Sequence, residues 1–143
     1  MNLGAFGCIF MMKRENIFYE NINDLSGLSK NHPMLALSFL IILFSLAGIP
    51  PLAGFFAKFY VFMAVIEVKM YALAIIGLVT TVVSAFYYLR IIKVIYFDKP
   101  SKPFDENYDW GLKSSLILSS ILILIYFIYP SILTNIVSSI IIY

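Results

Sequence analysis

Long apolar runs separated by short polar segments dominate the chain. Residues 31–57, 70–89 and 114–143 contain no Asp, Glu, Lys or Arg. Each run exceeds the roughly 18 residues that indicate a helix long enough to cross a bilayer. The pattern predicts an all-α fold, a polytopic membrane helix bundle with one discontinuous helix.

The predicted elements differ in whether they can cross a membrane alone. Residues 1–12 are apolar but reach only about 18 Å as a helix, so we interpret them as the end of a helix that begins on another polypeptide. The polar segment 13–32 is either a short surface helix or a solvated loop. Pro130 should kink or end the last span, leaving 130–143 as a short interfacial helix. The predicted spans are 33–66, 70–97 and 111–129.

The first span is too long to be one uninterrupted helix. Residues 33–66 would measure about 51 Å, well over the ~30 Å hydrocarbon thickness. Pro50 and Pro51 remove two amide donors, and Gly48 and Gly54 flank them. Each half is too short to cross alone, so a single broken helix is favoured over a hairpin. Because freed backbone groups at membrane depth need protein or water around them, the break should lie inside a bundle.

Composition excludes several classes of protein. With 62% hydrophobic and 13% charged residues and a mean hydropathy of +0.93, the chain is too apolar for a soluble globule. The net charge of +2 is dispersed and forms no basic stripe, so a nucleic-acid partner is not expected. A single cysteine, Cys8, and a single histidine, His32, indicate neither an internal disulfide nor a metal site.

Basic residues and small residues suggest how the helices are arranged. Three basic residues lie in 13–32 and five in 90–113, but one in the 67–69 turn. By the positive-inside tendency, the first two segments face the cytoplasm or matrix, and the C-terminus faces the opposite side. Gly77, Thr81 and Ala85 recur every four residues, a spacing that lets membrane helices approach closely.

Lys58 does not suit a passive membrane anchor. It lies about 13 Å along the second half-helix from Glu67, near the bilayer middle, where an ammonium costs roughly 2.5 to 3.5 kcal/mol. A desolvated amine can exchange its proton near neutral pH, whereas an arginine cannot. We therefore expect a proton relay. Two alternatives stay open: the side chain snorkels to the interface, or it pairs with a carboxylate on a helix outside this chain.

Other candidates for a proton path carry a weaker signal. His32, at the mouth of the first span, could pass protons or could simply be interfacial. Tyr87 and Tyr88 could line a hydrated path, although tyrosine is generally enriched where helices meet the interface.

The run SLAGIPPLAGFFAKFYVF, residues 45–62, closely resembles the signature of the subunit 2 family of respiratory NADH:ubiquinone oxidoreductase, complex I. Segments 1–7, 24–28, 85–93 and 96–100 are similar to other parts of that family. The resemblance implies an antiporter-like subunit that couples NADH:ubiquinone oxidoreduction to proton pumping, with Lys58 on the broken twelfth helix delivering protons outward. The family's earlier glutamate and lysines, on helices five, seven and eight, have no counterpart here.

The resemblance also implies partners and a location. No redox cofactor or redox chemistry is expected on this chain, since FMN, iron–sulfur clusters and quinone would belong to other subunits of the enzyme. Expected partners are the N-terminal piece of a split subunit on another chain, other complex I membrane subunits and the lipid bilayer. The mitochondrial inner membrane is the expected location, with a bacterial inner membrane as the alternative. Rival functions are a subunit of a multisubunit cation/proton antiporter and a structural scaffold without a relay.

Overall fold

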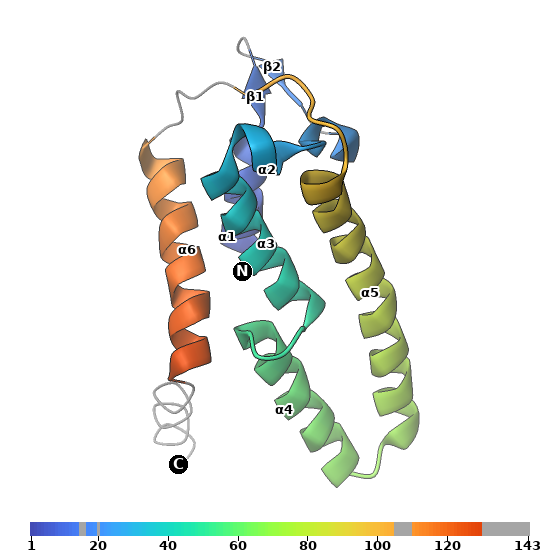
Figure 1. Cartoon of the computed structure of the whole chain (residues 1–143). Helices are drawn as coiled ribbons and strands as arrows, with labels where there is room; N and C mark the ends of the chain where they lie inside the picture. Colours follow the sequence, from blue (N-terminus) through green and yellow to red (C-terminus); the bar gives the residue numbers. More distant parts are fainter. Residues whose placement is uncertain (15–16, 20, 105–109, 130–143) are drawn as a thin grey trace.

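A computed structural model describes residues 1–14, 17–19, 21–104 and 110–129. Helices dominate this part of the chain (Figure 1). In chain order the elements are α1 (Asn2–Phe10), β1 (Lys13–Arg14), β2 (Ile17–Phe18), the 3-10 helix η1 (Ile22–Leu25), α2 (Leu28–Asn31), α3 (Pro33–Ala47), α4 (Ala53–Glu67), α5 (Tyr71–Phe97) and α6 (Trp110–Ile128). The predicted all-α fold class is confirmed, with one small exception.

The exception is a two-residue antiparallel ladder between β1 and β2, which pairs Lys13 with Phe18 and Arg14 with Ile17. Of the two alternatives for residues 13–32, the described part of the segment combines this ladder with two short helical turns, η1 and α2, and has no single surface helix. The Tyr19 N–H donates to the Met12 carbonyl at 3.0 Å, so the backbone after α1 is satisfied by folding back on itself and not by a helical turn.

The polar segments before α3 and after α5 lie together at one end of the molecule (Figure 1). The Gly27 N–H donates to the Val94 carbonyl at 3.1 Å, and the Ser101 N–H donates to the Ser26 carbonyl at 2.9 Å. The turn between α4 and α5, which carries Lys69, lies at the opposite end. The two segments richest in basic residues thus share one end, which is the arrangement that a common membrane side requires.

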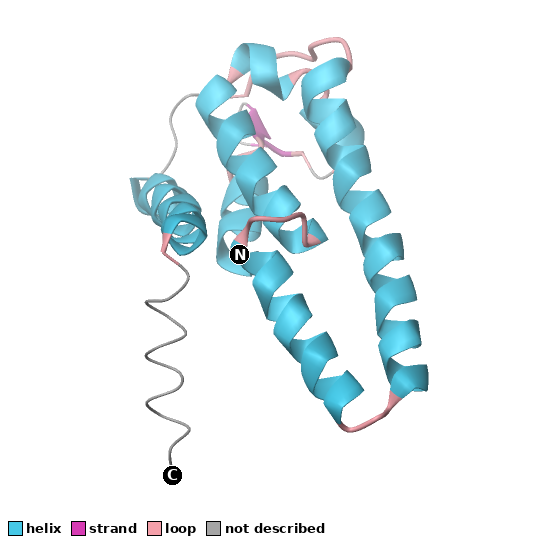
Figure 2. Ribbon diagram, turned by 60° about the horizontal axis from the view of Figure 1, so that its bottom comes forward, coloured by secondary structure: helices cyan, strands magenta, loops and turns pink. Residues whose placement is uncertain are grey.

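Helix α3 is central and contacts α1, α5 and α6. Its first residue is Pro33, which suits the first helical position because the missing N–H would have no partner there. Glycine lets α1 approach closely: a Cβ built on Gly4 would lie 2.7 Å from the Ile42 Cδ1 atom. Cys8, Phe39, Ile42 and Ile95 are among the buried residues of this core. Figure 2 shows α4 continuing from α3 across a short loop.

Helices α5 and α6 are the two described helices long and apolar enough to cross a membrane. One face of α5 packs on α4, where a Cβ on Gly77 would lie 2.7 Å from the Phe62 Cε1 atom. Its other faces leave large apolar side chains exposed, such as Val82 at 70%. An apolar exterior of this kind suits contact with lipid or with further helices. The predicted tail, 130–143, lies outside the described residues.

Candidate functional site

The helix is interrupted between Ala47 and Ala53. Gly48 follows α3 with φ +82°, a left-handed conformation that glycine adopts without steric cost. Pro50 and Pro51 then supply no N–H to continue the helix. The two flanking helices have 15 residues each, about 22 Å, so neither spans a ~30 Å core alone.

The last four carbonyls of a helix have no partner within it, so a break at membrane depth must satisfy them in another way. In α3, the first two of these four carbonyls, those of Phe44 and Ser45, accept hydrogen bonds from the backbone of the loop. The Ile49 N–H donates to the Phe44 carbonyl at 3.1 Å, and the Gly48 N–H donates to the Ser45 carbonyl at 3.1 Å.

The side chain of Lys58 donates hydrogen bonds to the other two carbonyls at the end of α3. Its Nζ donates to the Leu46 carbonyl at 3.0 Å and to the Ala47 carbonyl at 3.2 Å. The stem of this lysine lies against Gly48, where an added Cβ would be 3.0 Å from the Lys58 Cδ atom. The ammonium thus lies at the C-terminal end of α3, where the helix macrodipole is negative.

The direction of the Lys58 side chain follows from helix geometry. Side chains on an α-helix lean toward its N-terminus, so a lysine in the second turn of α4 reaches back to the break. In this structure it therefore does not snorkel toward Glu67 at the far end of α4. Its recorded contacts within the described residues are backbone carbonyls of the preceding half-helix.

Ser45 and Gly54 join the two half-helices directly. The Gly54 N–H donates to Ser45 Oγ at 3.1 Å. A Cβ built on Gly54 would overlap the carbonyl oxygen of Ser45, so only glycine permits this approach. Sequence reasoning marked Gly54 but missed Ser45. The usable signal was a hydroxyl side chain close to a helix break, because such a break exposes backbone donors that need an acceptor.

His32 lies at the other end of α3. It precedes Pro33, and α3 is about 22 Å long, so the helix separates it from the break. Its Nε2 accepts a hydrogen bond from the Phe104 N–H at 3.1 Å, and the two rings lie 6.4 Å apart. His32 thus connects the loop after α5 to the start of α3. In the part of the chain that the structure describes, it does not contact Lys58.

Tyr87 and Tyr88 lie on α5 at a different height from Lys58. Counted from the α4–α5 turn, Tyr88 is about 25 Å along α5 and Lys58 about 13 Å along α4. Tyr88 is half-buried against the core, whereas Tyr87 is exposed. The structure does not bring either tyrosine to the break, and both stay predictions as parts of a proton path.

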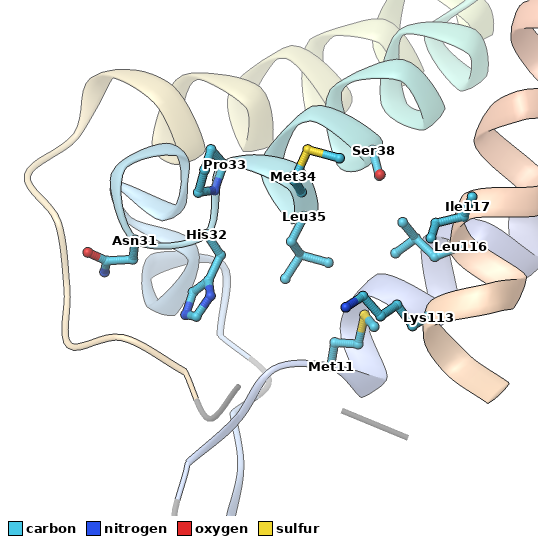
Figure 3. Close-up of a pocket in the computed structure, with 10 residues that line it drawn as sticks. All are labelled: Met11, Asn31, His32, Pro33, Met34, Leu35, Ser38, Lys113, Leu116 and Ile117. Carbon is cyan, nitrogen blue, oxygen red and sulfur yellow. The ribbon is translucent and has the colours of Figure 1, made fainter. Parts of the chain in front are cut away.

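A cleft of about 470 Å³ opens between α3 and α6, also away from the break (Figure 3). His32 and Leu35 lie on one side of it, and Lys113 and Leu116 of α6 lie on the other. Lys58 does not line it. Within the residues that the structure describes, no group of three or more His, Cys, Asp and Glu side chains could hold a metal ion.

Comparison with known proteins gives close relatives along nearly the whole chain. NADH-quinone oxidoreductase subunit N of Pelagibacter ubique is 65% identical over 98% of this chain. The protein of the same name from Parvibaculum lavamentivorans is 51% identical over 92% of this chain. The chain spans about 30% of the first relative's length and 27% of the second's.

A solved structure agrees with the fold. A chain of respiratory complex I from Thermus thermophilus, determined with bound aureothin, superposes with a TM-score of 0.74 at 26% identity. The match covers 90% of this chain and 30% of the other. A sequence-family model described as NADH:quinone oxidoreductase/Mrp antiporter, TM, matches residues 1–84, more than half of the 143 residues. The chain belongs to this family of antiporter-like membrane proteins.

Proposed function

We propose that this chain forms part of an antiporter-like membrane subunit of an NADH:quinone oxidoreductase, in which Lys58 relays protons. The relatives carry the name of that enzyme's subunit N, which favours it over a cation/proton antiporter within the same family. The chain's own redox role would be nil, with FMN, iron–sulfur clusters and quinone in other subunits. Its contribution would be proton transfer through the membrane.

The observation that carries the proposal is the position of the Lys58 amine in the helix break. Nζ donates to two carbonyls at the negative end of α3. The hydrogen bonds and the helix dipole each favour the charged form of the amine. Burial in a bilayer has the opposite effect, since it disfavours the charged form. An amine held between such opposing influences is suited to gaining and losing a proton.

The chemistry needs only one exchangeable proton. A lysine ammonium has three N–H donors, and two are directed to the carbonyls of Leu46 and Ala47. Peptide carbonyls accept hydrogen bonds but do not take the proton. The remaining N–H bond would therefore break as a water or a neighbouring base takes the proton, leaving a neutral amine that a donor from the other side recharges.

The rest of the path would lie on helices outside this chain. The relatives are more than three times as long, and the resemblance implies a glutamate and lysines on their earlier helices. Those helices would cover the exposed apolar faces of α4 and α5. That they belong to a second polypeptide of a split subunit stays a prediction. Because the relatives are bacterial, a bacterial inner membrane suits the chain better than the mitochondrial one.

Replacing Lys58 with arginine separates a relay from a helix cap. Arginine keeps the charge and the donors for the Leu46 and Ala47 carbonyls but cannot release a proton at physiological pH. In membranes that contain the assembled complex, we expect Lys58→Arg to abolish proton translocation driven by NADH oxidation, with assembly retained. Lys58→Ala should also abolish translocation. Lys93→Ala, which changes an exposed lysine on α5, is the matched control.

Each rival function gives a different result. Normal translocation in Lys58→Arg and Lys58→Ala would refute the relay and leave a structural scaffold. Sodium-dependent antiport by the purified assembly, without NADH oxidation, would instead assign the chain to the antiporter branch of the family.

A further inference from the structure

We propose that Ser45 is a positioning residue for the relay: it fixes the two half-helices against each other and so holds the Lys58 amine at the end of α3. The inference rests on the proposed function of Lys58. Ser45 is the first residue of the run 45–62, but the sequence alone assigned it no role of its own.

Ser45 is fully buried, with 0% of its surface exposed. Its Oγ accepts a hydrogen bond from the Gly54 N–H at 3.1 Å. That N–H belongs to the first turn of α4, where backbone donors have no partner in their own helix. The same Oγ donates to the Sδ of Met1 at 2.8 Å, which links the junction to α1.

This use of a helical serine differs from that of Ser84 and Ser120. Serine and threonine hydroxyls inside helices usually bond the carbonyl about one turn earlier in the same helix. Ser84 does so with Thr80, and Ser120 does so with Leu116, at 2.9 Å each. Ser45 instead receives a donor from another helix, so its hydroxyl joins two elements.

The backbone of Ser45 makes the second contact with α4. The Cα of Gly54 lies so close to the Ser45 carbonyl that a side chain there would overlap it. One residue thus meets Gly54 through both its hydroxyl and its carbonyl. Two contacts between the same pair of residues restrict sliding as well as separation of the half-helices.

This junction controls where the Lys58 amine lies. Gly54 and Lys58 are four residues apart, so they are neighbours on one face of α4. The carbonyls that accept from Lys58 belong to Leu46 and Ala47, the two residues directly after Ser45. Holding Gly54 on Ser45 therefore fixes Nζ within hydrogen-bonding distance of both carbonyls.

The test compares Ser45→Ala with Ser45→Thr, which keeps the hydroxyl, in the assembled membrane complex. The matched control is Ser120→Ala, a buried serine whose hydroxyl donates to the Leu116 carbonyl of its own helix, α6. Protons translocated and NADH oxidised are both measured per assembled complex. We expect Ser45→Ala to lower proton translocation about fivefold, the change in population that loss of one hydrogen bond typically produces. Ser45→Thr should restore it, and Ser120→Ala should match the parent.

A purely structural serine would give another outcome. Loss of assembled complex with parental translocation in what remains, or no assembled complex at all, would overturn the inference. Equal losses in Ser45→Ala and Ser45→Thr would also overturn it, because the hydroxyl would then not be the determinant. If Lys58→Arg translocates normally, the proposed function itself fails. If Lys58→Arg is inactive while Ser45→Ala is normal, only the role of Ser45 fails.

Discussion

Replacing Gly54 with alanine sets local helix preference against packing at the break. Gly54 lies in the first turn of α4, and alanine is preferred to glycine in helix interiors by about 1 kcal/mol. Propensity alone therefore predicts that Gly54→Ala stabilises the protein. The structure predicts the opposite, because the new methyl group would overlap the Ser45 carbonyl oxygen, a backbone atom that cannot rotate away.

The magnitude follows from the contacts that would be lost as α4 moves off α3. The hydrogen bond from Gly54 to Ser45 contributes about 1 kcal/mol, and one bond from the Lys58 ammonium to a carbonyl contributes about 1.5 to 3 kcal/mol. Subtracting the propensity gain of about 1 kcal/mol leaves a net destabilisation of about 1.5 to 3 kcal/mol.

The assay is the loss of assembled complex on heating membranes that carry the parent or Gly54→Ala. Gly111→Ala is the matched control, because a Cβ on Gly111, in the first turn of α6, meets nothing within 4 Å. We expect Gly111→Ala to equal or slightly exceed the parent in stability, and Gly54→Ala to fall below both. A Gly54→Ala complex as stable as the control would refute the close approach of the half-helices.

Two further glycines test other contacts by the same heating assay. Gly27→Ala should destabilise the end of the molecule that holds Gly27 and Pro100 by about 1 to 3 kcal/mol, because a φ of +64° is strained for alanine and a Cβ there would overlap the Pro100 backbone. Protease cleavage near the loop after α5 should also increase, and unchanged cleavage would contradict this contact. Gly77→Leu should destabilise the α4–α5 pair by about 1 to 3 kcal/mol through overpacking against Phe62, whereas Gly77→Ala should be milder because the aromatic ring can shift; equal effects would contradict the contact.

Much of the fold follows from features that the sequence displays directly. The long uncharged runs of α5 and α6 predict helices without knowledge of their neighbours, because apolar length alone sets that requirement. Pro50 and Pro51 mark an interruption for a reason that does not depend on tertiary context, namely the missing N–H. The ladder at 13–18 was not foreseen, since two-residue strands are too short to show a periodic pattern.

The site was less predictable than the fold. The charge of Lys58 and its predicted depth in the membrane marked it as a candidate. Its partners are backbone carbonyls, and every residue has one, so the sequence does not identify them. These carbonyls could be predicted as partners only by asking which donors satisfy the last four carbonyls of α3. His32, Tyr87 and Tyr88 were grouped with Lys58 by chemistry alone, and helix length keeps them apart in the described structure.

Stability alone gives little reason for a lysine at this break. Two hydrogen bonds from an ammonium to carbonyls contribute about 3 to 6 kcal/mol, and a charge at the depth predicted for Lys58, near the bilayer middle, costs about 2.5 to 3.5 kcal/mol. The net gain is small, and loop amides or water could close the same carbonyls without a buried charge. What distinguishes lysine from those alternatives, and from arginine, is that its charge can be removed. In the proposed relay, the two carbonyls would hold the amine in place in both protonation states.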